Sequence, residues 1–153
     1  MTLRFRKTIL AGALTAVAGA GTWLALPADA AAVPQMQFTY IVYDSPGTDT
    51  RTNASLNAEY VRITNNGAAN NLRNWTMKDT AGHTFTFPNH PIAKGARVWV
   101  HTGRGTNAGS NLYWGSGNYI WNNTGDTATL RSASGRVYDT CTWTRQGTGH
   151  TSC

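Results

Sequence analysis

Residues 59–88 read EYVRITNNGAANNLRNWTMKDTAGHTFTFP, a run of short alternating segments separated by polar turn residues. In the first segment Val61 and Ile63 fall on one face, and Tyr60 and Arg62 fall on the other. A period of two over this length is typical of a half-buried β-strand. The next two segments follow the same rule, with four apolar side chains predicted to point inward: Trp75, Met77, Phe85 and Phe87.

The rest of the chain after residue 35 continues this pattern. In MQFTYIV, the alternation predicts a strand whose inward side chains are Met36, Phe38, Tyr40 and Val42. Residues 44–57 are rich in turn formers and predict a loop of about fourteen residues. Further short strands are predicted in ARVWVHTG, NLYW, NYIW and the segment 126–143, and no helical apolar stripe occurs after residue 30. Seven to nine short strands predict an all-β fold, an immunoglobulin-like antiparallel β-sandwich.

The first 30 residues have the pattern of a signal peptide. Arg4, Arg6 and Lys7 precede an apolar run, and the run ends at Ala28-Asp29-Ala30, which fits a cleavage site. The alternative is a membrane anchor, because residues 8–26 approach the ~20 residues that span a bilayer. We expect cleavage, a secreted protein, no later transmembrane segment, and one domain over residues 31–153.

The charge of the chain gives weak guidance on partners. The formal net charge of +6 becomes +4 without residues 1–30, because that segment holds three basic residues and Asp29. The remaining Lys and Arg residues are scattered rather than clustered, which favours a solubility role. The alternative is weak binding to polyanions, such as nucleic acid or anionic wall polymers, through four arginines: Arg97, Arg104, Arg131 and Arg136.

The sequence has two cysteines, Cys141 and Cys153. An even count in an exported chain predicts a disulfide, which here would hold the C-terminal tail against the domain. A metal pair or a redox dithiol would need CxxC spacing or histidine ligands in register, and only His150 is near in sequence.

Catalytic and metal-binding patterns are weak. The sequence has no G-x-S-x-G or H-E-x-x-H motif and no pair of carboxylates that suggests glycoside hydrolysis, so we expect neither an enzyme nor a cofactor. Asp126 is interpreted as a turn residue that caps backbone amides. Asp139 falls on the same face of the predicted last strand as Val137, so we expect it to be partly buried and to need a partner such as an arginine. The alternative is an exported hydrolase that uses His83 or His101.

A calcium site is a further alternative in the first loop. Asp44, Asp49 and Asn53 carry suitable oxygens, but they lack the D-x-D-x-D-G ladder. The glycine-rich segment 101–111 lacks the G-K-[ST] ending of a phosphate loop, and it is interpreted as a flexible hairpin connection.

The aromatic residues suggest a ligand surface. Trp75, Trp114 and Trp121 are expected in the core, because large aromatics at strand ends usually fill a sandwich. Trp99 lies on the face opposite Val98 and is the tryptophan most expected to be exposed, followed by Tyr113. The predicted ligand surface consists of Trp99, His101, Arg104 and Tyr113.

Five segments occur in a characteristic order over about residues 36–143: AEYVRITNNG, LRNWTMKDTAGHTFTFP, IAKGARVWVHTGRG, NLYW and IWNNTGDTATLRSASGRVYD. Their order resembles that of the lamin tail domain family, in its bacterial exported branch. Each motif alone is weak, and the specificity lies in their joint order. The resemblance implies an immunoglobulin-like β-sandwich, and Trp75, Trp114 and Trp121 match pattern positions of the family.

The resemblance also implies a function. Family members look like adaptor or targeting modules, and some are appended to exported hydrolases or nucleases. We therefore expect a secreted, monomeric, non-catalytic binding module that contacts an extracellular polymer or protein. The tail that carries Cys141 and Cys153 departs from the family pattern.

Overall fold

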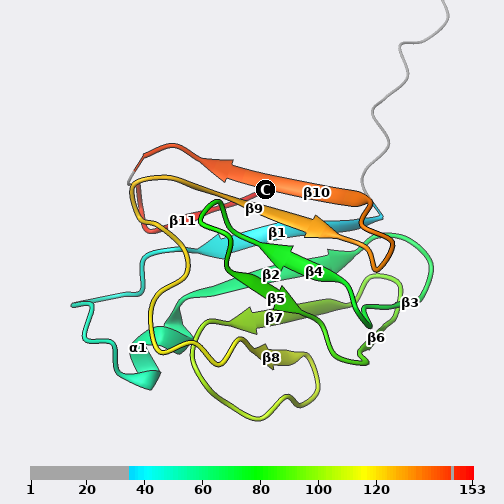
Figure 1. Ribbon diagram of the computed structural model, residues 1–153, viewed down its shortest axis with the longest axis horizontal. Helices are drawn as coiled ribbons and strands as arrows, with labels where there is room; N and C mark the ends of the chain where they lie inside the picture. The colour runs from blue at the N-terminus through cyan, green and yellow to red at the C-terminus, as the bar shows by residue number, and fades with distance from the viewer. Residues whose placement is uncertain (1–34, 146) are drawn as a thin grey trace, which may run out of the picture. The chain divides into compact units, whose positions relative to one another are not determined.

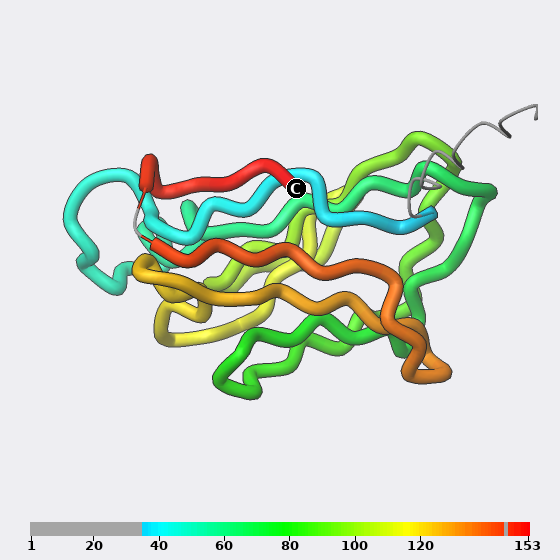
Figure 2. Tube along the Cα trace, turned by 90° about the horizontal axis from the view of Figure 1, so that it is seen from above, coloured from blue at the N-terminus to red at the C-terminus, as the bar shows by residue number. Residues whose placement is uncertain are grey.

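The computed structural model describes residues 35–145 and 147–153, which form two packed β-sheets. Figure 1 shows the strands, and Figure 2 shows the sheets as two layers, with β11, β1 and β2 in one and β10, β9 and β4 in the other. The first sheet has the order β11 (His150–Thr151), β1 (Met36–Val42), β2 (Tyr60–Asn65), β7 (Arg97–His101) and β8 (Asn111–Tyr113). The second has the order β10 (Val137–Trp143), β9 (Asp126–Arg131), β4 (Thr76–Lys78) and β5 (Thr84–Thr86). A small third sheet pairs β3 (Asn70–Asn71) with β6 (Pro91–Ile92).

This architecture confirms the predicted immunoglobulin-like β-sandwich. The predicted signal peptide, residues 1–30, lies outside the described residues. Within the described part of the chain, no helix is long and apolar enough to cross a membrane.

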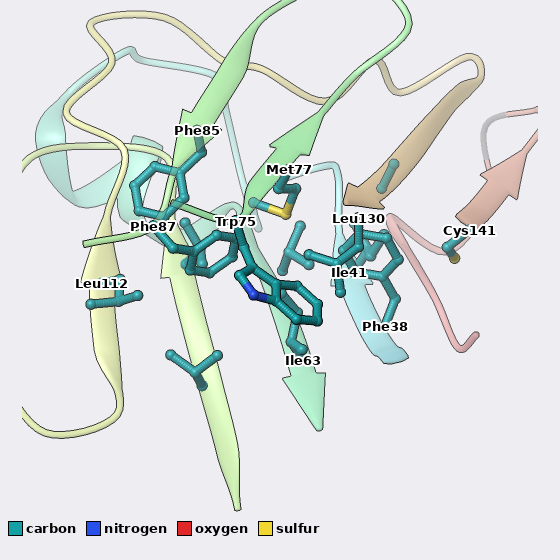
Figure 3. Packing of buried hydrophobic residues seen from close by; sticks show 14 of the residues in the cluster. Phe38, Ile41, Ile63, Trp75, Met77, Phe85, Phe87, Leu112, Leu130 and Cys141 are labelled. Atoms are coloured by element: carbon teal, nitrogen blue, oxygen red, sulfur yellow. The ribbon is translucent and has the colours of Figure 1, made fainter. Parts of the chain in front are cut away.

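The core lies between the two sheets. Met77 and Leu130 of the second sheet point toward Ile41 and Ile63 of the first (Figure 3). The predicted inward positions of β2, β4, β5 and β7 are all buried, as alternation requires. Of the three tryptophans expected in the core, Trp75 and Trp121 are buried, and Trp114 is half-buried and packs against the cluster.

The prediction for β1 was wrong after Phe38. A β-bulge shifts the register between Phe38, which pairs with Ile63, and Tyr40, which pairs with Arg62. The extra residue inverts the alternation, so the buried side chains that follow are Ile41 and Tyr43 instead of Tyr40 and Val42. The bulge therefore turns Tyr40 to the outer face of the sheet.

A second bulge corrects the prediction for β10. The register shifts between Val137 and Asp139, so Val137 is 42% exposed while Cys141 is buried. Asp139 is half-buried, and its carboxylate accepts a hydrogen bond from the Phe38 backbone N–H at 2.7 Å rather than from an arginine. This bond connects the edge strand of the second sheet to β1 of the first.

The predicted loop 44–57 contains a short helix, α1 (Asn53–Ala58). Thr52 caps its N-terminus, because the hydroxyl accepts a hydrogen bond from the Ser55 N–H. Leu56 is the one apolar residue that α1 buries, so the helix is too short to show an apolar stripe in the sequence. It lies where β7 ends (Figure 1).

The connection between β7 and β8 was also predicted wrongly. It is not a hairpin, because the two strands pair in parallel, with Trp99 opposite Asn111 and His101 opposite Tyr113. Parallel neighbours need a crossover, and residues 102–110 provide it by leaving the sheet toward α1. The other pairs of the two main sheets are antiparallel.

The predicted disulfide between Cys141 and Cys153 is confirmed, with a Cα–Cα distance of 5.7 Å. Cys141 belongs to β10 in the second sheet, whereas the tail that carries Cys153 joins the first sheet through β11. The bridge therefore links the two layers of the sandwich.

Candidate binding face

Each strand of the five-stranded sheet contributes an aromatic ring to a row that crosses its outer face. We call these five residues the aromatic row; in strand order from β11 to β8 they are His150, Tyr40, Tyr60, His101 and Tyr113. The distances between successive ring centroids are 5.2, 6.3, 5.6 and 5.2 Å. His150 is exposed and the other four rings are half-buried. An unbroken chain of ring contacts thus crosses the whole sheet.

Strand register explains why the rings meet. Tyr60 lies directly opposite His101, and His101 lies directly opposite Tyr113 across the parallel pair. Tyr40 reaches Tyr60 diagonally, because the bulge in β1 places Val42 opposite Tyr60. Val42 is also opposite His150, which puts that ring diagonally beside Tyr40. One extra residue at Thr39 therefore completes the row.

Arg62 and Trp99 form a second line beside the aromatic row. Arg62 lies opposite both Tyr40 and Trp99 in the sheet register. Its guanidinium carbon is 5.2 Å from the centre of the Tyr40 ring, and its Nε donates to the Thr39 hydroxyl at 3.0 Å. Its Nη2 also donates to the Thr39 carbonyl at 3.4 Å. The arginine is thus held within the sheet surface by cation–π and hydrogen-bond contacts.

Both ring nitrogens of His101 are hydrogen-bonded. Nδ1 lies 2.8 Å from the Asn57 carbonyl oxygen, which can only accept, so this nitrogen carries a proton. Nε2 then acts as an acceptor, and it lies 3.0 Å from the side-chain amide of Asn111, which donates to it when its nitrogen faces the ring. These two contacts fix the plane of the ring, which suits a stacking surface better than a proton-transfer role.

Two hollows open along the aromatic row. One, of about 430 Å³, is lined by Tyr60, Trp99, His101, Ser110 and Asn111. The other, of about 450 Å³, lies at the β1–β11 end, where Tyr40 and His150 meet the loops 44–47 and 147–149. We call them the Trp99 hollow and the His150 hollow. Each combines aromatic rings with groups that can form hydrogen bonds.

The loop after β7 closes one end of the row. Gly105 packs on the Tyr113 ring so closely that a Cβ atom there would lie 2.5 Å from the ring carbon Cε1. The Arg104 N–H donates to Asn53 Oδ1, and the Arg104 carbonyl accepts from the side-chain amides of Asn53 and Asn57. The glycine-rich segment is therefore fastened to α1 by its backbone.

Three of the four residues of the predicted ligand surface lie together. Trp99 and His101 line the same hollow, and His101 stacks on Tyr113. Arg104 lines a different hollow, of about 360 Å³, beside α1 with Arg51. Sequence reasoning did not include the other members of the face, which are Tyr40, Tyr60, Arg62 and His150. For Tyr60 and Arg62 a signal existed, since they alternate with Val61 and Ile63.

The residues considered for catalysis or metal binding have structural partners. His83 Nδ1 lies 2.6 Å from Asp79 Oδ2, and Asp79 also accepts from the backbone N–H groups of residues 82 and 83. The Asn53 amide is engaged by Arg104, and Asp49 accepts from Ser45 at 3.3 Å. Across residues 35–145 and 147–153, no group of three or more His, Cys, Asp or Glu residues is placed to hold a metal ion.

Asp126 acts as a cap, in agreement with its interpretation from the sequence. Its carboxylate accepts hydrogen bonds from the backbone N–H groups of Thr80, Asn122 and Thr127. It therefore joins the turn after β4 to the start of β9.

The four arginines considered for polyanion binding are dispersed. Arg131 and Arg136 belong to the β9–β10 hairpin, where Arg131 Nη1 donates to the Gly135 carbonyl at 3.1 Å. Arg97 begins β7, whereas Arg104 follows its other end. The four arginines thus fall in three separate parts of the fold: the β9–β10 hairpin, the start of β7 and the loop after β7.

Glu59 is a buried carboxyl at the start of β2. Its Oε1 accepts hydrogen bonds from the Thr102 hydroxyl at 2.6 Å and from the backbone N–H groups of Ile120 and Trp121. Within the described part of the chain, its Oε2 has no hydrogen-bond partner. Burial raises the pKa of Glu59 from 4.5 to about 7, although the hydrogen bonds lower it. The carboxyl therefore pins the segment that leads into β9 against the end of β7.

Comparison with known proteins agrees with this architecture. No curated protein matches the chain. The family described as Lamin Tail Domain matches residues 29–145, which is most of the chain and includes both sheets apart from β11. It is a family of non-enzymatic immunoglobulin-like domains. The chain belongs to the lamin tail domain family.

Proposed function

We propose that this protein is an exported, non-catalytic binding module that contacts an extracellular polymer through the outer face of its five-stranded sheet. The aromatic row carries the proposal, because aromatic side chains gathered on one accessible surface are enriched at binding sites. Membership of an immunoglobulin-like domain family supports a binding role. The signal-peptide pattern of residues 1–30 and the disulfide support export, since disulfides persist in oxidising compartments.

The geometry of the face supports binding over catalysis. His101 is held at both ring nitrogens, and Arg62 is held by Thr39 and Tyr40. Groups fixed in this way present a preorganised surface, which lowers the entropy lost when a ligand binds.

Co-sedimentation of the secreted protein with purified cell-wall polymer and with DNA-coated beads tests the proposal. We expect retention on the wall polymer at both low and high salt. Tyr60→Ala, which removes the central ring, should weaken retention, whereas Thr86→Ala, an exposed position in the second sheet, should not. Retention that Tyr60→Ala leaves unchanged would contradict the assignment of the face. Loss from both supports at high salt would instead support polyanion binding through the arginines.

A further inference from the structure

We propose that the polymer is an uncharged polysaccharide whose chain lies along the aromatic row, between the Trp99 hollow and the His150 hollow. This inference rests on the proposed function of the face and names the chemical class of its ligand.

The Trp99 hollow has the two kinds of group that recognise a sugar ring. Pyranose rings present C–H groups on their faces, which pack on aromatic surfaces, and hydroxyls at their edges, which need hydrogen-bond partners. Tyr60, Trp99 and His101 supply aromatic surface to this hollow, while Ser110 and Asn111 supply a hydroxyl and an amide. An aromatic wall with a few polar groups can thus hold one sugar and fix its orientation.

The His150 hollow repeats this combination at the other side of the sheet. Tyr40 and His150 provide rings whose centroids are 5.2 Å apart, and the exposed Thr148 adds a hydroxyl. Neighbouring strands are ~4.8 Å apart, so the four steps from β11 to β8 cover roughly 19 Å. Two similar hollows joined by a continuous row of rings favour a chain of sugars over a single one.

The charges of the face favour a ligand without charge. Arg62 is already engaged by Tyr40 and Thr39, and Arg97 is the other arginine on these strands. Among the described residues, neither the Trp99 hollow nor the His150 hollow is lined by a lysine or an arginine. A binder of single-stranded nucleic acid also uses aromatic stacking, but it adds a positively charged groove along the backbone. Two arginines that lie outside both hollows do not form such a groove along the aromatic row.

Pelleting of the secreted protein with insoluble cellulose and chitin, and titration with a soluble neutral β-glucan, test the inference. Poly-dT and polygalacturonate serve as polyanions of comparable length. We expect retention on at least one neutral polysaccharide, with an affinity that changes less than about twofold between low and high salt, as expected for a ligand without phosphates.

Two variants locate the sugar chain. Trp99→Ala should lower the affinity about tenfold, the typical effect of truncating a central aromatic contact. His150→Ala, at an exposed tail position, should lower the affinity for long chains, which reach both hollows. It should leave the affinity for a disaccharide unchanged, because a disaccharide fits within the Trp99 hollow. Thr86→Ala is the control, and thermal melting of each variant verifies folding. Since His150 is exposed in a two-residue strand, its variant keeps the test informative even if Trp99→Ala destabilises the fold.

The outcomes separate this inference from the proposed function. Salt-sensitive binding to poly-dT or polygalacturonate alone would overturn the neutral polysaccharide and leave a binding module. Neutral binding that neither Trp99→Ala nor His150→Ala changes would overturn the position of the sugar chain. Failure to bind any polymer would overturn the proposed function, and this inference with it.

Discussion

Glu59 shows how one residue can be structural without appearing so in the sequence. As the only glutamate, at the start of a strand, it suggested no partner and no carboxylate pair. The structure buries it completely and directs three donors at Oε1, from segments more than 40 residues away. The cost of burying its charge, rather than a neighbouring ion, dominates the rise in its pKa.

The buried carboxyl predicts a pH-dependent stability. The pKa of Glu59 is about 7 in the folded state and 4.5 ordinarily, so the folded state holds the proton more tightly. The resulting stabilisation is fully present below pH 4.5 and is lost as pH rises through 7, a change of roughly 3 kcal/mol. The measurement is urea unfolding at several pH values between 4.5 and 8. The free energy of unfolding of Glu59→Gln, whose amide cannot ionise, should fall much less over this range than that of the native protein.

Two other groups with shifted pKa values, Asp139 and His90, determine which control the pH measurement needs. Burial also raises the pKa of Asp139 and lowers the pKa of His90, so both contribute to the pH profile. Asp139→Asn is the matched variant, because it removes a second carboxyl with a raised pKa while leaving Glu59 in place. If the free energy of unfolding of Glu59→Gln falls with pH as steeply as that of the native protein, the Glu59 carboxyl is not the source of the pH dependence.

At the scale of strands, the sequence predicted regular elements well and their irregularities poorly. Val61, Ile63, Met77 and Phe85 followed from a period of two, because the pleat alone decides which face a side chain takes. The bulge in β1 depends instead on distant contacts, such as that between Asp139 and the Phe38 N–H. The assignment of Tyr40 to the outer face therefore could not be obtained from local alternation.

The same limit applies to the binding face. Trp99 was predicted because it alternates with Val98 and Val100, which are buried, within its own strand. His150 joins the row only because the tail pairs with β1, and strand pairing between distant segments leaves no local signal. The parallel direction of β8 also depends on the attachment of residues 103–105 to α1, which involves Asn53 and Asn57.

The tail is predicted to depend on its disulfide. Cys141 and Cys153 are 12 residues apart, and a loop of this length gives a stabilisation of ~3 kcal/mol in the chain-entropy model. The Cys141→Ser/Cys153→Ser double variant should therefore melt at a lower temperature and keep its β-rich circular dichroism spectrum. Hydrogen exchange should rise first in β11, which has two residues. An unchanged melting temperature would contradict a stabilising role for the bridge.

For the molecule as a whole, the sandwich restricts pairing between copies at the edges of its sheets. An edge strand exposes unpaired backbone groups that can template another chain. Three of the four edges of the two main sheets are short: β11 has two residues, and β5 and β8 have three each. The fourth, β10, has seven residues, but it packs near β1 and is bridged to the tail through Cys141.

These edges predict a monomer whose solubility depends on the tail. Sedimentation velocity of the oxidised protein should give one species with a monomer's mass at every concentration tested. The Cys141→Ser/Cys153→Ser variant no longer ties the C-terminal tail to β10, so this variant should self-associate as its concentration rises. Charged substitution on the edge, Thr140→Lys, should suppress that association, because lysine on an edge strand opposes pairing. A concentration-dependent dimer of the oxidised protein would show instead that another surface mediates self-association.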